Sequence, residues 1–446
     1  MTKLRVFIRD QMTSFRVILI GFVLVILAGA VLLSLPVSTV SGESTPFLDA
    51  LFTSTSAACV TGLVVQDTAT YWSAFGKCII LFLIQIGGLG VVSVAVFMMV
   101  LSGRQIGIHQ RSVMQDAISA PQFGGIVKFT KFFIFGTLIF EVFGALLLAP
   151  AFMVDFGIFK GLWYALFHSV SAFCNAGFDL MGVRGRFSSL TTYYNNAWVL
   201  VIIMVLIIAG GIGFYTWRDL LDQRFKWKYL RVQTKMILFI TFFLLLLPFL
   251  YFFFGEFSGY PLEERFLYSM FQSVTPRTAG FNTYDYGKMS EGGLLVTIVL
   301  MLIGGAPGST AGGMKVTTVF LLLLTCISNL RRREEVNCFR RRMDHSVIQN
   351  AFSIWMIYVM LLLAGTGMIA SEDSIPIIHS MFECASALGT VGLTVGITST
   401  LSSMSKIILI TFMYFGRVGG LTIAYAALST RKKPFKKYPM EKIAVG

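Results

Sequence analysis

Four short segments of the chain share a pattern that could hold a dehydrated metal cation. They read LFTSTSAACVTGL, LFHSVSAFCNAGF, MFQSVTPRTAGF and MFECASALGTVGL. In three of them a Phe precedes a Gly by ten residues, and in the third segment the gap is nine. The glycines are Gly62, Gly177, Gly280 and Gly392. Glycine reaches backbone angles that are closed to other residues, so it suits a narrow path lined by backbone carbonyl groups. The pattern therefore predicts one ion filter built from four parts.

The residues beside these glycines indicate which kind of ion the filter would bind. The predicted ion-binding residues are Val60, Thr61, Gly62, Asn175, Ala176, Gly177, Thr278, Ala279, Gly280, Thr390, Val391 and Gly392. None of them carries a carboxylate, so the site would rely on carbonyl dipoles, which favours a monovalent alkali cation over calcium. The helices that precede the glycines would also point their negative C-terminal ends toward the ion.

The segments that carry the glycines are too short to cross a membrane. Pro46, Pro261 and Pro376 mark helix starts, and about 11 to 14 helical residues are expected to follow each start. We predict re-entrant helices, because irregular backbone is tolerated at membrane depth only beside protein or a water-filled cavity. The alternative is four interfacial helices or ordinary extracellular loops, which would leave the four similar copies unexplained.

The composition is that of a membrane protein. Of the 446 residues, 56% are hydrophobic and 13% are charged, and the mean hydropathy is +0.76. Long apolar runs recur at residues 17–35, 138–153, 198–213, 236–254 and 354–369, and about 20 apolar residues cross a bilayer. The basic residues before the first run could belong to a signal peptide, but the run is too long and a retained span is expected. The predicted fold class is an all-α polytopic membrane protein with eight transmembrane helices and four pore helices around one pore.

The chain reads as four tandem repeats of span, pore helix and span. We predict a single pore domain over residues 1–446, with repeats at about 15–103, 125–220, 232–330 and 347–430 and a cytoplasmic tail at 431–446. The second span of each repeat carries a similar glycine motif, and the four copies read IGGLG, AGGIG, IGGAPG and FGRVGG.

The net charge of +14 is concentrated in five segments that alternate with the apolar spans. This asymmetry predicts that both termini are cytoplasmic. A nucleic-acid partner is not expected, because no polar module carries the basic residues, whereas anionic lipid or an acidic cytoplasmic partner fits them. The six cysteines show no paired spacing, so neither a disulfide framework nor a transition-metal site is predicted. No nucleophile–base pattern or nucleotide fingerprint indicates an enzyme.

TPRTAGFN, GTVGLT, VTGL and SAFCNAGF resemble the four filters of the Trk/Ktr/HKT superfamily. The resemblance runs from about residue 15 to residue 430. Glycine at all four positions goes with potassium selectivity in that family, so Gly62 implies that K⁺ is the transported ion. The short N-terminus resembles the bacterial Ktr-type membrane subunit. That resemblance implies potassium uptake across the bacterial cytoplasmic membrane by a homodimer with a separate cytoplasmic nucleotide-binding regulatory ring, and no cofactor on this chain.

GGAPGSTAGGMK interrupts the second span of the third repeat at residues 304–315. Its glycines and proline would break any helix, and the resemblance implies an intramembrane loop that obstructs the pore below the filter. The predicted gate residues are Gly304, Gly305, Gly308, Ser309, Thr310, Gly312, Gly313 and Arg417. A phosphate-binding loop is disfavoured because G-K-[ST] is missing. Lys315 could either snorkel to the cytoplasmic surface or take part in gating.

Arg417 replaces the second glycine of the pair found in the other three repeats. A guanidinium within a span faces a cavity or a partner. The resemblance implies a barrier to cation flow, and the alternative is an ion pair with Glu383 or Glu141. Arg277, next to the third filter, is expected to brace its backbone. The alternative function is a sodium-coupled secondary transporter with alternating access, which would predict inverted repeats and carboxylates on the pathway.

Overall fold

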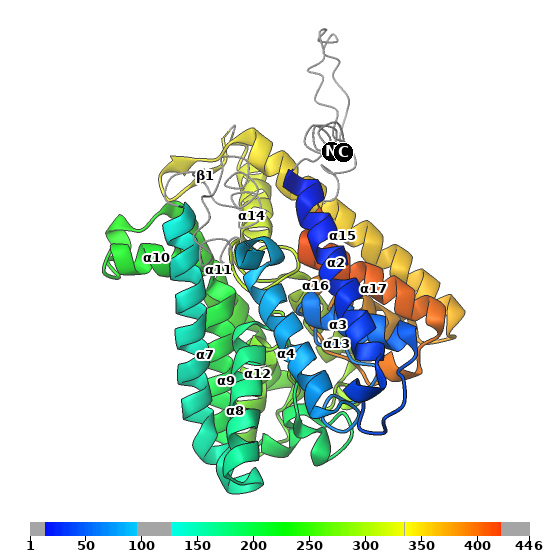
Figure 1. Cartoon of the computed structure of the whole chain (residues 1–446). Helices are drawn as coiled ribbons and strands as arrows, with labels where there is room; N and C mark the ends of the chain where they lie inside the picture. The colour runs from blue at the N-terminus through cyan, green and yellow to red at the C-terminus, as the bar shows by residue number, and fades with distance from the viewer. Residues whose placement is uncertain (1–13, 96–125, 334, 421–446) are drawn as a thin grey trace, which may run out of the picture.

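The computed structural model describes residues 14–95, 126–333 and 335–420, and these are mostly helical (Figure 1). Within these residues, four helices are long and apolar enough to cross a membrane, or five if the bent pair at 197–222 counts as one span. They are α2 (Ser14–Ser34), α7 (Ile126–Phe156), α11 (Val232–Tyr251) with its continuation η5 (Phe252–Glu256), and α15 (His345–Glu372). The prediction of a polytopic helical membrane protein is confirmed at this level. The predicted tail at 431–446 and the basic residues before residue 14 lie outside the described residues.

Four short helices stand where pore helices are predicted. They are α3 (Phe47–Ala58), α8 (Ile158–Phe173), α12 (Leu262–Val274) and α16 (Ile377–Gly389). Three of them begin directly after the expected prolines. α8 instead follows Gly157, whose φ of +79° suits glycine, and its 16 residues exceed the expected length. Each short helix packs against the helix that precedes it in the chain.

The helices that follow the short helices share one kind of start. They are α4 (Ala74–Leu89), α9 (Ala197–Ile212), α13 (Glu291–Leu302) and α17 (Ser403–Val418). Each has an N-cap side chain that accepts a hydrogen bond from the backbone N–H three residues on. These caps are Ser73, Asn196, Ser290 and Ser402. Such caps satisfy backbone donors that the first turn leaves free.

These four helices all end within the stretch that is expected to form the second span of the repeat. The sequence predicts such a break in the third repeat only. α4, α9 and α17 end at Gly90, Gly213 and Gly419, whose φ values are +80°, +90° and +92°. After Gly213 the chain turns by 88° into α10 (Phe214–Asp222). In the third repeat the residues between α13 and α14 (Val316–Leu330) form an irregular loop. The expected continuous spans of the first, second and fourth repeats are therefore interrupted, because a left-handed glycine ends a helix.

The remaining elements are short. The 3₁₀ turns are η1 (Pro36–Ser38), η2 (Met181–Val183), η3 (Ser189–Tyr193), η4 (Trp227–Tyr229), η6 (Tyr286–Lys288) and η7 (Thr398–Thr400). Two strands, β1 (Asn337–Cys338) and β2 (Arg341–Arg342), form an antiparallel hairpin. Figure 1 shows this hairpin and α10 near the same end of the molecule, from which α7 and α15 run toward the other end.

Glycines let the first span of a repeat approach its pore helix closely. A Cβ atom on Gly144 of α7 would lie 2.4 Å from Ser169 Oγ and 2.7 Å from Leu206 Cδ1. The Ser169 hydroxyl donates a 2.6 Å hydrogen bond to the Glu141 carbonyl oxygen of α7. Gly29 of α2 has the same surroundings in the first repeat, with Ser54 and Leu83 in the matching places. This contact fixes the depth of the pore helix.

Replacing Gly144 by Ala is expected to destabilise the protein by about 1–3 kcal/mol, the usual effect of overpacking a tight contact. The measurement is the thermal unfolding midpoint in detergent. Gly255→Ala is the matched control, because no heavy atom lies within 4 Å of a Cβ at Gly255. An equal shift in both variants would contradict the close contact.

Candidate ion pathway

The four predicted filter glycines meet in a closed ring. A Cβ atom built on any of them would lie 2.1 to 2.6 Å from a carbonyl oxygen of the next repeat. That oxygen always belongs to the residue before the next glycine. The pairs are Gly62 with Ala176, Gly177 with Ala279, Gly280 with Val391, and Gly392 with Thr61. Because the series returns to its start, the four loops surround one axis. We call these four residues the glycine ring.

The backbone takes the same path through the ring four times. The ring glycines have φ values of +69° to +96°. The residue two positions earlier also has a positive φ, of +51° to +65°, although it is not a glycine. These residues are Val60, Asn175, Thr278 and Thr390. Such conformations cost energy in residues with a side chain, so the surrounding structure must hold them in place.

A hydroxyl group at one register near the end of the short helix holds the loop in the first, third and fourth repeats. The fourth residue after the repeat Phe is Ser56, Ser171, Thr275 or Ser386. Ser56 Oγ and Ser386 Oγ each accept a 3.0 Å hydrogen bond from the N–H of the ring glycine in their own repeat. Thr275 Oγ1 donates to the carbonyl of Phe281 at 2.7 Å. Sequence reasoning missed this role, although the register of the hydroxyls is visible in the sequence.

The repeated glycine motif of the second spans has a clear steric reason. In the first, second and fourth repeats, a Cβ atom on its first glycine would lie 2.0 to 2.2 Å from a carbonyl oxygen at the C-terminal end of the short helix, whereas one on Gly304 of the third repeat would meet the Gly312 carbonyl oxygen at 2.2 Å. This contact joins Gly87 to Ala58, Gly210 to Phe173, and Gly416 to Leu388. The second span therefore passes directly against the pore-helix terminus, which only a residue without a side chain permits.

The irregular loop of the third repeat lies against the ring loops and the second spans. A Cβ atom on Gly312 would lie 2.0 Å from Thr390 Oγ1, and one on Gly313 would lie 2.8 Å from the Gly389 carbonyl oxygen. Hydrogen bonds tie the loop to the second and fourth repeats. They run from Ala306 N to Gly211 O (2.9 Å), Phe214 N to Gly308 O (3.0 Å), Thr310 Oγ1 to Phe173 O (3.0 Å) and Gly313 N to Gly416 O (3.1 Å). The structure thus brings the predicted gate residues together beside the ring.

Arg417 connects this loop to the first repeat. Its guanidinium donates hydrogen bonds to the carbonyl oxygens of Thr310 and Gly87, and one of 3.3 Å to that of Gly88. Within the described part of the chain it forms no ion pair with Glu141 or Glu383, so the alternative of a structural ion pair is not supported.

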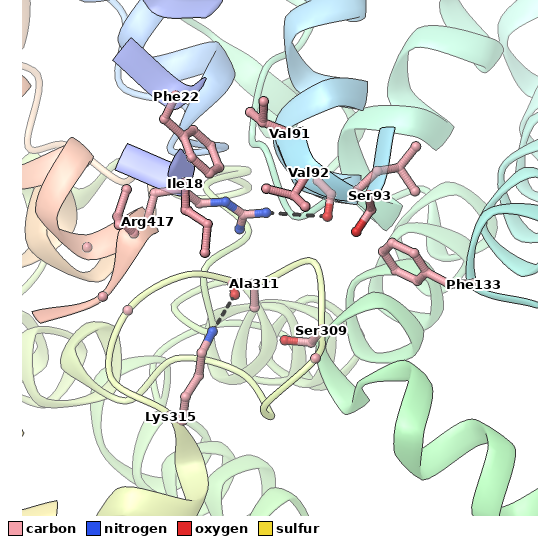
Figure 2. Close-up of a pocket in the computed structure, with 18 residues that line it drawn as sticks. Ile18, Phe22, Val91, Val92, Ser93, Phe133, Ser309, Ala311, Lys315 and Arg417 are labelled. Atoms are coloured by element: carbon pink, nitrogen blue, oxygen red, sulfur yellow. Dashed lines mark hydrogen bonds between the residues drawn. The ribbon is translucent and has the colours of Figure 1, made fainter. Parts of the chain in front are cut away.

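Lys315 is also bound to the loop. Its Nζ donates a 2.8 Å hydrogen bond to the Ala311 carbonyl oxygen. Figure 2 shows Lys315 reaching toward Ala311 and Arg417 reaching toward the segment of Val91 and Val92. Both side chains line a cavity of about 150 Å³. Lys315 therefore ties down the loop rather than reaching away from it.

Residues 9–436 match the family TrkH, described as "Cation transport protein". The chain belongs to this family. Membership confirms the resemblance stated from the filter motifs, and it places the chain among transporters rather than enzymes.

Several relatives extend over the full length. The chain is 37% identical to the potassium/sodium uptake protein NtpJ of Enterococcus hirae, and the match covers 100% of both chains. It is 37% identical to the Ktr system potassium uptake protein B of Bacillus subtilis, over 98% of this chain and 97% of that protein. The crystal structure of the potassium transporter TrkH from Vibrio parahaemolyticus shares the fold, with a TM-score of 0.74, 20% identity and coverage of 94% and 86% of the two chains.

Arg277, which is expected to brace the third filter segment, contacts a neighbouring helix. It is buried, and its Nη2 donates a 3.3 Å hydrogen bond to Thr241 Oγ1 of α11. The guanidinium thus anchors the third filter segment to α11. The backbone carbonyl oxygen of Arg277 accepts a 3.2 Å hydrogen bond from Asn175 Nδ2. This bond links the second and third repeats.

A cavity of about 80 Å³ adjoins the ring where the chain leaves the ring glycines. Asp67 and Asp179 line it, and sequence reasoning did not single them out. The Asp67 carboxylate accepts hydrogen bonds from the backbone N–H groups of Ala69, Thr70 and Phe187. Carboxylates at the mouth of a narrow path raise the local concentration of cations.

Proposed function

We propose that this chain takes up K⁺ across the bacterial cytoplasmic membrane as the membrane subunit of a two-component transport system. The observation that carries the proposal is the closed glycine ring. The names of the relatives support it, since one is a Ktr system potassium uptake protein. The proposed architecture is one pore domain of four tandem repeats, with eight transmembrane helices and four pore helices. The bent and broken second spans each count as one crossing.

The filter would bind K⁺ through backbone carbonyl oxygens. The proposed ion-binding residues are each ring glycine and the two residues before it. Because the four ring residues are glycines, carbonyl oxygens can replace the hydration shell of the ion without placing a full charge in its path. The pore-helix C-termini, each equivalent to about half a negative charge, favour a cation at the same place.

The loop at 304–313 and Arg417 would form the gate. In this arrangement backbone hydrogen bonds and the Arg417 guanidinium hold the loop in the closed position. A net hydrogen bond contributes about 0.5–1.5 kcal/mol, and one from a charged group about 1.5–3 kcal/mol. Opening therefore requires a few kcal/mol, which the binding of a regulatory partner can supply.

The proposed partners are a second copy of the chain, a separate cytoplasmic nucleotide-binding regulatory ring and membrane lipid. The β1–β2 hairpin offers exposed basic groups, including Arg341 and Arg342. Arg342 forms an ion pair of 2.9 Å with Glu335. The proposed topology has both termini and this hairpin in the cytoplasm, in agreement with the distribution of basic residues.

Replacing Gly62 by Ser tests the selectivity. In a K⁺-uptake-deficient bacterium the wild-type chain is expected to support Rb⁺ uptake. K⁺ is expected to compete with Rb⁺ for this uptake, and Na⁺ is not. Gly62→Ser is expected to reduce this discrimination by at least about tenfold, because its Cβ would lie 2.5 Å from the Ala176 carbonyl oxygen. Unchanged selectivity, or growth rescue without Rb⁺ uptake, would count against the proposal.

A sodium-coupled transporter with alternating access is the second candidate, since the name of one relative includes sodium. Proteoliposomes separate the two proposals. Coupled transport would show Na⁺ entry in fixed proportion to K⁺, whereas a filter would pass K⁺ when Na⁺ is absent from both sides.

A further inference from the structure

One buried position on the pore helices varies in chemistry from repeat to repeat. The residue after the repeat Phe is Thr53, His168, Gln272 or Glu383, and each is 0% exposed. Burying a polar group without a partner is costly. The partners of these side chains therefore indicate what the position does.

Glu383 contacts the chain just after it leaves the ring. Its carboxylate accepts hydrogen bonds from the Thr394 hydroxyl, from the Val395 backbone N–H at 3.3 Å and from the Thr398 hydroxyl at 2.8 Å. These residues follow Gly392 by two, three and six positions. One buried carboxylate thus fixes the segment that follows the ring glycine of the fourth repeat. We call the segment in this position the exit segment of a repeat.

His168 makes the matching contact in the second repeat. Its Nε2 accepts a 3.3 Å hydrogen bond from the backbone N–H of Leu180, three residues after Gly177. Its Nδ1 lies 2.7 Å from the Tyr164 carbonyl oxygen. The two bonds require a neutral imidazole with the proton on Nδ1, because Nε2 must accept.

Gln272 does the same in the third repeat with two hydroxyl groups. Its Nε2 donates a 3.4 Å hydrogen bond to Thr283 Oγ1, and its Oε1 accepts one from the Tyr286 hydroxyl. These partners follow Gly280 by three and six residues, as in the fourth repeat. Three chemically different side chains therefore contact the equivalent segment, the residues that follow the ring glycine of their own repeat.

In the first repeat, the residue at this position does not contact the exit segment. Thr53 is too short to reach the exit segment, and its hydroxyl donates to the Asp49 carbonyl oxygen of its own helix at 3.0 Å. The Asp49 carboxylate, one turn earlier, accepts a 3.2 Å hydrogen bond from Gln66 Nε2 and forms a 2.9 Å ion pair with Lys406. Gln66 follows Gly62 by four residues, and Lys406 belongs to α17 of the fourth repeat.

We propose that His168, Gln272 and Glu383 are positioning residues that keep the filter selective by anchoring the segment after each ring glycine. This inference rests on the proposed potassium function. None of the three touches the ion. Each holds the chain that follows the ring glycine of its own repeat. In the fourth repeat the Ser386 hydroxyl also accepts a hydrogen bond from the N–H of Gly392 itself. A filter loop held at one end only can adapt its carbonyl oxygens to a smaller cation.

The test compares Glu383→Ala, Glu383→Gln and Thr53→Ala as full-length proteins in proteoliposomes. Glu383→Ala is expected to lower the K⁺-over-Na⁺ flux ratio by at least about tenfold, through the loss of its hydrogen bonds to the exit segment. Glu383→Gln keeps an acceptor oxygen and is expected to stay within about threefold of wild type. Thr53→Ala is the matched control at the same register, and its flux ratio should equal that of wild type.

Amide hydrogen exchange gives a readout that does not depend on transport. Exchange in the segment 393–400 should accelerate in Glu383→Ala and not in Thr53→Ala. If Glu383→Ala fails to fold, His168→Ala tests the same idea at the segment 178–183. A wild-type flux ratio in a folded alanine variant, or an equal loss in Thr53→Ala, would overturn the inference. A wild-type protein that carries no K⁺ would instead overturn the proposed function, while the exchange result would still report on the anchoring.

Discussion

Gly392→Ala is expected to abolish most potassium uptake, with a fall of at least about 30-fold. The new Cβ would lie 2.1 Å from the Thr61 carbonyl oxygen and 2.9 Å from Gly62 Cα, and both are backbone atoms that cannot turn away. The φ of +91° adds strain of about 1–2 kcal/mol for a residue with a side chain. The measurement is the initial rate of ⁸⁶Rb⁺ uptake into proteoliposomes.

Gly259→Ala is the control for this substitution. A Cβ at Gly259 would meet no heavy atom within 4 Å, so its uptake should match that of wild type. Normal uptake by a folded Gly392→Ala protein would mean that the ring is not the path of the ion.

Arg417→Ala is expected to raise basal flux by at least about tenfold in the absence of any cytoplasmic partner. The substitution removes three hydrogen bonds that tie the loop and the first repeat together. Charge-assisted hydrogen bonds contribute about 1.5–3 kcal/mol each, and about 1.4 kcal/mol is a factor of ten. The loss of the positive charge also lowers the barrier to a cation. The measurement is ⁸⁶Rb⁺ flux through the purified chain alone.

Two further variants separate these effects. Arg417→Lys keeps the charge but loses the planar fork that reaches several carbonyl groups, so an intermediate flux is expected. Arg218→Ala in α10 removes an exposed arginine whose ion pair with Asp222 contributes little, and it should leave flux unchanged. Unchanged flux in a folded Arg417→Ala protein would exclude the guanidinium from the gate.

The repeat pattern allowed much of the fold to be predicted, because steric demands leave local traces in a sequence. The prolines before α3, α12 and α16 fix helix starts, and the ring glycines stand where a Cβ would collide with a neighbouring repeat. Both signals act within a few residues of the feature they specify. The convergence of the four glycines followed from treating the copies as equivalent.

What could not be predicted depends on contacts between distant segments. The breaks at Gly90 and Gly419 occur inside apolar stretches that continue beyond the glycine. The run at 198–213 ends at Gly213, and the 88° turn there depends on contacts with the third-repeat loop, such as the hydrogen bond from Phe214 N to Gly308 O. The partners of Arg417 lie 107 and 330 residues away, so the choice between carbonyl groups and a glutamate could not be made from spacing. The partner of Arg277 could not be identified for the same reason, since Thr241 belongs to α11, more than 30 residues earlier in the chain.

The contact between Gly392 and Thr61 joins the last repeat to the first, which the chain itself never connects directly. The other three boundaries of the ring lie between repeats that follow one another in the sequence. This seam is held by packing of α17 on α3, by the Lys406–Asp49 ion pair and by the 3.0 Å hydrogen bond from the Tyr414 hydroxyl to the Leu19 carbonyl oxygen. It is the one boundary at which the two repeats are not successive in the sequence, so packing and side-chain contacts alone hold it. A pull on the two ends of the chain is therefore expected to separate the first and fourth repeats at this boundary before the other three.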